Sequence, residues 1–242
     1  MVVDGKQIAE EIVASLGDSL RGRTLGMVVN GGDAATESFV KIKERVAERL
    51  GVIVKKGELQ ELLSTCDGVL VQLPHPDAGV LTPQIPPELD VDALGLHPEV
   101  LAPVAAAVKE IIARTWGSRT SPKGVKAVVV GEGKLVGKPV AAMLREEGYS
   151  VEVISLEQGT LAALKDADVV VSGAGSPHLI KPEMLKAGVI LIDAGTSEQA
   201  GKIVGDCDPA CADVASVFTP VPGGVGPIAV AMLFKNLATL TK

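Results

Sequence analysis

The apolar and polar positions of this 242-residue chain separate into two halves that meet at about residue 104. The second half carries near-continuous apolar runs that alternate with helical patterns, which is typical of parallel strands covered on both faces. The first half also alternates, but it ends in a proline-rich stretch over 73–103. Helices are expected at 4–20, 36–50, 58–64, 103–115, 136–147, 160–165 and 227–240, with one more opened by Pro182. Strands are expected at 25–29, 68–73, 126–130, 151–155, 168–172 and 189–193.

This order of elements predicts an α/β fold of two lobes. Residues 1–104 are expected to form an N-terminal α/β catalytic domain. Residues 105–226 are expected to form a doubly wound parallel-sheet domain of Rossmann type, with a plain loop at 117–124. The last helix, over 227–240, is expected to return to the first lobe.

Composition and charge exclude several classes of protein. The formal net charge of −7 argues against nucleic acid as a partner, and the 2% of aromatic residues argues against stacking on bases. No segment approaches the roughly 20 unbroken apolar residues of a membrane span, and acidic residues interrupt any N-terminal signal peptide. The three cysteines and three isolated histidines form no metal-ligand pattern. An odd cysteine count without a secretory signal favours a cytoplasmic location.

The turn after the strand at 126–130 reads Gly131-Glu-Gly-Lys-Leu-Val-Gly137. Glycines between a strand and a helix allow backbone amides and the helix N-terminus to hold a pyrophosphate. The spacing is one residue longer than the common fingerprint, so the motif alone is weak. Its place between a predicted strand and a predicted helix favours nucleotide binding over a structural turn.

Two glutamates bear on the choice of dinucleotide. Glu157 ends the next predicted strand, 24 positions after Gly133, where an acidic residue binds the ribose hydroxyls of NAD. Glu132 adds a second carboxylate, and like charges repel a 2′-phosphate. The pair predicts that NAD is used at least as well as NADP. The alternative, equally supported by the sequence, is that both are solvated surface charges.

One lysine of the predicted helix 36–50 lies on its apolar side. Lys43 falls on the same helical stripe as the apolar residues, whereas the other charges of the helix lie on other faces. Burial lowers the pKa of a lysine amine toward neutrality, so that it can act as a general base. The alternative, equally supported by this helix alone, is a lysine whose stem covers apolar surface while its charge stays in water. The apolar residues of the stripe are Phe39, Ile42, Val46 and Leu50.

Residues 219–227 read Thr-Pro-Val-Pro-Gly-Gly-Val-Gly-Pro. The prolines stiffen this segment and the glycines permit close approaches, so it forms a shaped loop between a strand end and a helix start. The loop closely resembles the signature loop of the methylenetetrahydrofolate dehydrogenase/methenyltetrahydrofolate cyclohydrolase (FolD-type) family. Further segments similar to family motifs occur in order along nearly the whole chain, at 38–43, 67–74, 90–92, 136–139, 172–177 and 190–196.

The resemblance implies a reaction and a set of site residues. The reaction is NAD(P)-dependent oxidation of 5,10-methylenetetrahydrofolate to the 5,10-methenyl form, followed by hydrolysis to 10-formyltetrahydrofolate. Tetrahydrofolate is then the substrate carrier, and a homodimer is implied by the family only. The implied catalytic residues are Lys43, Gln72 and Asp92. The implied substrate-binding residues are Phe39, Gln72, Leu73, Pro74, Asp92, Pro222, Gly223 and Gly224. The implied cofactor-binding residues are Gly131, Glu132, Gly133, Val136, Gly137, Pro139, Glu157, Gly173, Ala174, Gly175 and Thr196.

The chain departs from the family pattern in places. Phe39 stands where the family has a tyrosine, so the ring remains and the hydroxyl is lost. Ala93 follows Asp92 where the family has a glycine. The segment between Asp92 and the predicted helix 103–115, and the stretch between the predicted helix 36–50 and Gln72, are shorter than in typical members. Two alternatives therefore stay open. One is a different Rossmann dehydrogenase, and the other is a folate- or nucleotide-binding protein with weakened cyclohydrolase activity.

Overall fold

The computed structural model describes residues 1–31, 34–116, 122–157, 159–199 and 201–242. The chain divides into two compact units. The three-stranded unit comprises residues 9–103 and 229–242, and the five-stranded unit comprises residues 1–8 and 104–228. The division expected from the sequence differs at the first eight residues, which group with the second half of the chain rather than the first. The expected loop at 117–124 lies largely outside the described residues.

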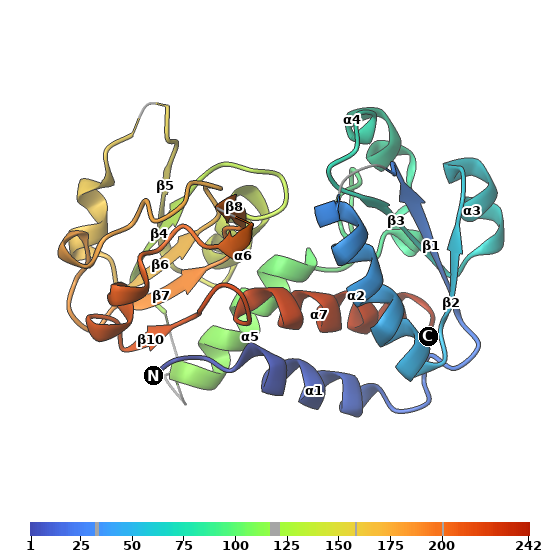
Figure 1. Ribbon diagram of the computed structural model, residues 1–242, viewed down its shortest axis with the longest axis horizontal. Coiled ribbons are helices and arrows are strands. Elements are labelled where there is room, and N and C mark those ends of the chain that lie inside the picture. The colour runs from blue at the N-terminus through green and yellow to red at the C-terminus, as the bar shows by residue number, and fades with distance from the viewer. Residues whose placement is uncertain (32–33, 117–121, 158, 200) are drawn as a thin grey trace. The chain divides into compact units, whose positions relative to one another are not determined.

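The three-stranded unit is built on a parallel sheet in the order β2-β1-β3 (Figure 1). β1 (Thr24–Val29) and β3 (Gly68–Gln72) are its apolar, buried strands. β2 (Ile53–Lys56) was not expected, because its two lysines and partly exposed side chains give no buried-strand pattern. An edge strand carrying lysines is a common protection against pairing with another chain. The carboxyl ends of β1 and β3 meet where Val29 pairs with Gln72.

Helices cover this sheet and fill the connections. The longer ones are α1 (Gly5–Leu16), α2 (Ala34–Leu50) and α7 (Val225–Leu240), and α3 (Leu59–Thr65) packs on β1 and β3. The proline-rich stretch after β3 contains α4 (Ala78–Leu81) and the 3₁₀ helices Thr82–Gln84 and Pro87–Leu89. Two of the three boundaries between the units fall inside α1 and α7, each of which contributes residues to both.

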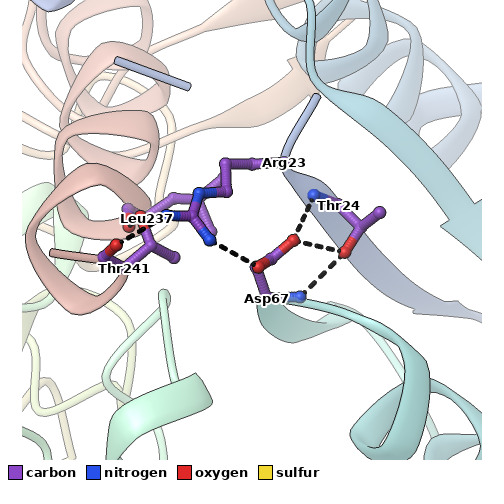
Figure 2. Close-up of polar contacts among 5 residues, drawn as sticks. All are labelled: Arg23, Thr24, Asp67, Leu237 and Thr241. Atoms are coloured by element: carbon purple, nitrogen blue, oxygen red, sulfur yellow. Dashed lines mark hydrogen bonds and ion pairs between the residues drawn. The ribbon is translucent and has the colours of Figure 1, made fainter. Parts of the chain in front are cut away.

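A polar network ties the end of α7 to the amino ends of β1 and β3 (Figure 2). The Asp67 carboxylate accepts hydrogen bonds from the backbone N–H and the hydroxyl of Thr24, both at 2.7 Å. Arg23 donates to the same carboxylate at 3.0 Å and to the carbonyl oxygen of Thr241 at 2.9 Å. The last turn of α7 is therefore fixed to this unit by charge-assisted hydrogen bonds.

The five-stranded unit is a parallel sheet in the order β10-β7-β6-β4-β5 (Figure 1). Its strands are β4 (Lys126–Val130), β5 (Ser150–Ile154), β6 (Val169–Ser172), β7 (Ile190–Asp193) and β10 (Val217–Phe218). The central strands are fully buried, as the near-continuous apolar runs predicted. The α/β fold with parallel sheets is thus confirmed.

The connections of this unit differ more from the sequence-based expectation than its strands do. α5 (Pro103–Trp116) and α6 (Gly137–Glu146) are α-helices, as expected. The segments Leu161–Asp166 and Pro182–Met184 are 3₁₀ helices instead. Each is too short to build a stable α-helix, and the greater rise of a 3₁₀ helix, about 2 Å per residue, suits a short crossover. A further 3₁₀ helix covers Pro209–Asp213, and the hairpin of β8 (Ser197–Gln199) with β9 (Lys202–Val204) was not expected.

The first residues of the chain pair with β10. Val3 N–H donates to the Phe218 carbonyl at 2.8 Å, and Phe218 N–H donates to the Met1 carbonyl at 2.9 Å. Gly5 N–H then donates to the carbonyl of Gly223 at 3.0 Å. Residues 1–3 therefore lie along the edge of the five-stranded sheet, and with the contact of Gly5 they explain why residues 1–8 group with this unit.

Candidate active site

The buried face of α2 contains one ionisable side chain. The buried residues of this helix recur at intervals of three and four, and Lys43 stands in the middle of that series. Its side chain is half-buried. The buried residues are Thr36, Val40, Ala47 and Leu50. The sequence-based inference that Lys43 points inward agrees with this placement.

The apolar stripe that was expected around Lys43 is partly wrong. Phe39 and Ile42 are 38% and 41% exposed, so they lie beside the buried face and not on it. The mistake has a simple cause, because the buried series includes Thr36 and Ala47, which do not count as strongly apolar in a pattern. Phe39 leaves its ring on the surface of the helix near Lys43, where a ligand could pack against it.

The amine of Lys43 is held by Gln72. Lys43 Nζ donates to Gln72 Oε1 at 2.7 Å. The other end of the Gln72 amide donates to the carbonyl oxygen of Leu73 at 2.7 Å, which fixes the direction of the side chain. Gln72 is buried at the carboxyl end of β3, and Pro74 follows Leu73 through a cis peptide bond. The structure thus brings together two of the three predicted catalytic residues.

The third predicted catalytic residue, Asp92, acts electrostatically on the same amine. Burial lowers the pKa of Lys43, and the negative charge of Asp92 opposes that shift. Burial raises the pKa of Asp92 to about 6, against the attraction of Lys43 and with repulsion from Asp90. The two groups therefore lie closer in proton affinity than an ordinary lysine and aspartate, and a larger share of the amine is uncharged than in an exposed lysine.

Two residues that the sequence reasoning did not select hold Asp92 in place. Asp90 is fully buried, and its Oδ2 accepts a hydrogen bond from Gly95 N–H at 2.6 Å. Asn236 of α7 donates from Nδ2 to the carbonyl oxygens of Val91 and Leu101, both at 2.9 Å. An asparagine inside an otherwise apolar helix was the available signal for the second contact.

Ala93, directly after Asp92, adopts a left-handed backbone conformation with φ of 54°. This is the position at which family members carry a glycine. A Cβ in this region costs about 1–2 kcal/mol, whereas glycine adopts it freely. The departure from the family pattern therefore leaves local strain next to a predicted catalytic carboxylate.

Replacing Ala93 with glycine is expected to raise the free energy of unfolding by about 0.5–1 kcal/mol, because the relieved strain exceeds the entropy that glycine adds to the unfolded chain. Ala93→Val should lower it, since a β-branched side chain is less tolerated at positive φ. Urea denaturation of the three proteins measures the effect. Equal midpoints for all three would contradict the strain.

The predicted dinucleotide turn is shaped by Gly131 and Gly137, two positions at which a Cβ would be strained or would clash. A Cβ on Gly137 would lie 2.0 Å from the carbonyl oxygen of Gly131, and Gly131 itself has φ of 98°. A Cβ on Gly173 would lie 2.3 Å from the Val136 side chain. Gly133 has no atom near the position of a Cβ, so its backbone is open on that side. The turn is a tight cradle at the N-terminus of α6, which suits a pyrophosphate.

The remaining predicted cofactor residues lie on loops at the same edge of the five-stranded sheet. Val130 of β4 pairs with Ile154 of β5 and with Ser172 of β6, so the segments that follow these strands are neighbours. Glu132 and Glu157 are both exposed there. The other residues of this edge are Pro139, Ala174, Gly175 and Thr196, on the loops or helix that follow β4, β6 and β7.

The signature loop is rigid for reasons that its sequence predicts. Gly224 N–H donates to the Pro220 carbonyl at 2.8 Å, and a Cβ on Gly224 would lie 2.6 Å from the same oxygen. Gly223 has φ of 108°, and the bond between Val221 and Pro222 is cis. α7 begins at Val225, two residues before the expected start. Pro222 is exposed, while Gly224 is buried against Gly5.

Among the described residues, no group of three or more His, Cys, Asp or Glu side chains could hold a metal ion. In the same part of the chain, no helix is both long enough and apolar enough to cross a bilayer. The candidate site residues of the three-stranded unit are an amine, an amide and carboxylates, and those of the five-stranded unit lie on glycine-rich loops.

Comparisons with known proteins agree with both sets of features. A sequence model of the tetrahydrofolate dehydrogenase/cyclohydrolase NAD(P)-binding domain matches residues 102–242. The bifunctional protein FolD of Halothermothrix orenii is 36% identical over 283 aligned positions, which cover 100% of this chain and 98% of that protein. The aligned length exceeds 242 because the relative carries residues that this chain lacks.

Solved structures give the same result. The bifunctional FolD enzyme of Campylobacter jejuni superposes with a TM-score of 0.89 at 28% identity, covering 100% of this chain and 98% of that one. The Trypanosoma brucei methylenetetrahydrofolate dehydrogenase-cyclohydrolase, solved with NADP cofactor and an inhibitor, superposes with a TM-score of 0.86 at 29% identity, covering 100% and 97%. The chain belongs to the tetrahydrofolate dehydrogenase/cyclohydrolase family.

Proposed function

We propose that this protein oxidises 5,10-methylenetetrahydrofolate to 5,10-methenyltetrahydrofolate with NAD(P)⁺ and hydrolyses the product to 10-formyltetrahydrofolate. The observation that carries the hydrolytic half is the half-buried amine of Lys43, 2.7 Å from Gln72 Oε1, with a lowered pKa. The glycine cradle between β4 and α6 supports the dehydrogenase half. Family membership supports both.

In the oxidation, the bound nicotinamide supplies the hydride acceptor. The chain supplies position and not a base, because the cation that remains on the methenyl carbon is stabilised by its two flanking nitrogens. Gly133 and Gly137 would hold the pyrophosphate through backbone N–H groups and the N-terminus of α6. Gly131, whose N–H donates to the Ile154 carbonyl at 2.9 Å, would shape the turn. Asp92 would accept hydrogen bonds from the pterin amino and ring N–H groups.

The hydrolysis needs proton transfer. A water oxygen adds to the cationic methenyl carbon, and neutral Lys43 takes a proton from that water. The bond from this carbon to N5 then breaks, and N5 receives the proton that Lys43 took up. The hydroxyl group on the carbon releases its own proton to solvent as the carbonyl forms, so the formyl group stays on N10. Gln72 Oε1 directs the amine, and burial keeps a larger share of it uncharged than in an exposed lysine.

Phe39 favours a second candidate function in which the hydrolytic step is weak. The family tyrosine would offer a hydroxyl at this position, and Phe39 has none to donate or accept a hydrogen bond. Its exposed ring can still pack against a pterin. If the hydroxyl of the family tyrosine contributes to proton transfer, this chain is a folate-binding dehydrogenase with reduced cyclohydrolase activity.

An absorbance assay with 5,10-methylenetetrahydrofolate and either dinucleotide tests the proposed function. The formation of NADH or NADPH together with 10-formyltetrahydrofolate is the expected result. Reduced dinucleotide with accumulating methenyltetrahydrofolate would support the weakened cyclohydrolase. A protein that binds the dinucleotide but turns over no folate would overturn the assignment.

The family domain that matches residues 102–242 is an NAD(P)-binding domain, and we infer the use of NAD from two side chains. Glu132 and Glu157 follow the ends of neighbouring strands, and both are exposed. Each would repel a 2′-phosphate and could accept hydrogen bonds from ribose hydroxyls. The kcat/KM with NAD is therefore expected to equal or exceed that with NADP.

Replacing Glu132 with arginine should shift the ratio of kcat/KM toward NADP by about 10-fold, since a shift of roughly 1.4 kcal/mol is tenfold. Glu157→Lys should act in the same direction. Glu146→Lys is the matched control, because it changes the net charge similarly at the far end of α6. An unchanged ratio in all three variants would mean that the glutamates are surface charges without a role in cofactor choice.

A homodimer and a cytoplasmic location are further proposals. The first follows from the family and the second from the odd number of cysteines. The described residues include three free cysteines, of which Cys207 and Cys211 are buried. Sedimentation of the purified protein tests the dimer.

A further inference from the structure

A buried carboxylate outside the predicted catalytic set lies beneath the loop that follows β6. Asp206 has no exposed surface. Its Oδ2 accepts hydrogen bonds from the hydroxyl of Ser172 and from the backbone N–H of Ala174, both at 2.7 Å. Its Oδ1 accepts one from the backbone N–H of Ser176 at 2.8 Å. One carboxylate therefore determines the path of the whole segment 172–176.

A second buried carboxylate fixes the first. Asp193, at the end of β7, accepts hydrogen bonds from the backbone N–H groups of Gly195 at 3.0 Å, Asp206 at 3.2 Å and Cys207 at 2.8 Å. Its own N–H donates to the hydroxyl of Thr219, at the start of the signature loop, at 2.7 Å. Asp193 and Asp206 thus link the loops that follow β6 and β7 to the first residue of the signature loop.

Two glycines make this arrangement possible. A Cβ on Gly195 would lie 2.2 Å from Cγ of Asp206, and a Cβ on Gly205 would lie 2.1 Å from Oδ2 of Asp193. At Gly195 and Gly205 the backbone lies so close to the two carboxylates that no side chain would fit. Burying a carboxylate is costly unless its oxygens accept hydrogen bonds. The arrangement of Asp193 and Asp206 therefore depends on every donor being in place.

The array reaches the predicted dinucleotide turn through one short contact chain. Ser172 and Ala174, which Asp206 holds, flank Gly173. A Cβ on Gly131 would lie 2.7 Å from the carbonyl oxygen of Gly173, and a Cβ on Gly173 would lie 2.3 Å from Val136. The backbone at Gly173 therefore packs tightly against both ends of the glycine turn. A displacement of segment 172–176 is expected to move the glycine turn as well.

We propose that Asp206 is a positioning residue for the dinucleotide. It shapes segment 172–176, and through it the turn 131–137, without touching the ligand itself. Asp193 supports it by fixing its backbone. This inference rests on the proposed function, because it requires that the glycine turn binds a dinucleotide.

Asp206→Asn is the decisive variant, since it keeps the size of the side chain but changes one acceptor oxygen into an NH₂ donor. Either orientation of the amide sets this NH₂ against a backbone N–H, of Ala174 or of Ser176, so the loop has to move. The KM and Kd for the dinucleotide are expected to rise about tenfold or more. Hydrolysis of methenyltetrahydrofolate, which uses no dinucleotide, should keep its kcat and KM within about twofold and reports that the variant is folded.

Two further variants complete the test. Ser172→Ala removes one of the three donors and should raise the dinucleotide KM by a smaller factor, about threefold. Asp168→Asn is the matched control at the opposite end of β6, where the carboxylate accepts a hydrogen bond from Lys126 N–H at 3.0 Å and pairs with Lys186 at 2.6 Å. It should leave the dinucleotide KM unchanged.

The outcomes separate the inference from the proposed function. If wild-type protein binds no dinucleotide, the proposed function fails and this inference fails with it. If the wild type binds and Asp206→Asn binds equally well, only this inference is overturned. A parallel loss of both activities in Asp206→Asn would show a general structural role and would also overturn it. If Asp206→Asn does not fold, Ser172→Ala decides: a raised dinucleotide KM supports the inference, and an unchanged one contradicts it.

Discussion

Replacing Lys43 with methionine is expected to lower the rate of methenyltetrahydrofolate hydrolysis by about 10²–10⁴-fold, the usual contribution of a general base. Methionine keeps much of the apolar stem and removes the amine. The dehydrogenase rate should fall far less, because hydride transfer from the methylene carbon needs no protein base. Both rates are measured on the same preparation, so the ratio of the two activities is the readout.

Lys41→Met is the matched control for this prediction. Lys41 lies on the same helix, two residues earlier, and its side chain is 64% exposed in an ion pair with Glu37. Exposed pairs of this kind contribute little, so neither activity should change measurably. If Lys43→Met retained full hydrolytic activity, or lost no more than Lys41→Met, Lys43 would have no part in the chemistry.

Replacing Asp92 with asparagine is expected to change stability and substrate binding in opposite directions. The neutral amide avoids the desolvation of a buried carboxylate, so the free energy of unfolding at pH 8 should rise, with an upper bound of about 3 kcal/mol for a pKa displaced by roughly two units. The lost attraction to Lys43 reduces that gain. The KM for the folate should rise at least about tenfold, because an amide cannot accept two hydrogen bonds from the pterin in the way a carboxylate does.

The raised pKa of Asp92 determines how the free energy of unfolding changes with pH. The pKa of Asp92 is about 6 in the folded protein, above the ordinary value of 3.8. A group raised in this way contributes stability that is fully present below pH 3.8 and is lost as the pH rises through 6. The free energy of unfolding of the wild type should therefore decline over this window, and Asp92→Asn should decline less. Burial raises the pKa of Asp193 to about 6 too, so part of the decline should persist in the variant.

Urea denaturation between pH 4 and 8 measures the first effect, and steady-state kinetics at pH 8 measures the second. A variant that is less stable at pH 8 and binds the folate normally would contradict both halves of the prediction. Such a result would make Asp92 an ordinary structural carboxylate. A gain in stability together with a loss of binding is typical of a residue kept for function.

The parallel sheet of the five-stranded unit could be predicted because its strands carry their own signal. β4 occupies 126–130, as expected, because a run of apolar residues after Lys126 suits a strand covered on both faces. β2 could not be predicted, because an edge strand with two lysines has neither alternation nor an apolar run. The 3₁₀ crossovers were taken for α-helices because both share capping residues and a similar period.

The direction of Lys43 was inferred correctly from a stripe that was itself misplaced. The buried series of α2 runs through Thr36, Val40 and Ala47, and two of these, Thr36 and Ala47, do not count as strongly apolar in a sequence pattern. Lys43 stays inward in either series because it lies at helical spacing from Leu50 in both. The hydrogen bond from Lys43 to Gln72 joins residues 29 positions apart, so only the family motif could suggest it.

The supporting residues of the site were not accessible to sequence reasoning. Asn236 bonds to carbonyl oxygens more than a hundred positions away, and Asp206 collects donors from a loop about thirty positions earlier. Such contacts depend on the folded path of the backbone and produce no periodic pattern in the sequence. A polar or charged residue among apolar neighbours was the signal available in the sequence, and at Asp206 the structure adds a close approach by Gly195.

The most direct test of the account is the pKa of the Lys43 amine, measured by NMR titration of the lysine side chains and assigned by the resonance that Lys43→Met removes. The account predicts that this amine titrates below the ordinary value of 10.5, and lower again in Asp92→Asn, where the stabilising negative charge is gone. An amine that titrates together with the exposed lysines near 10.5, in the wild type and in the variant alike, would contradict it.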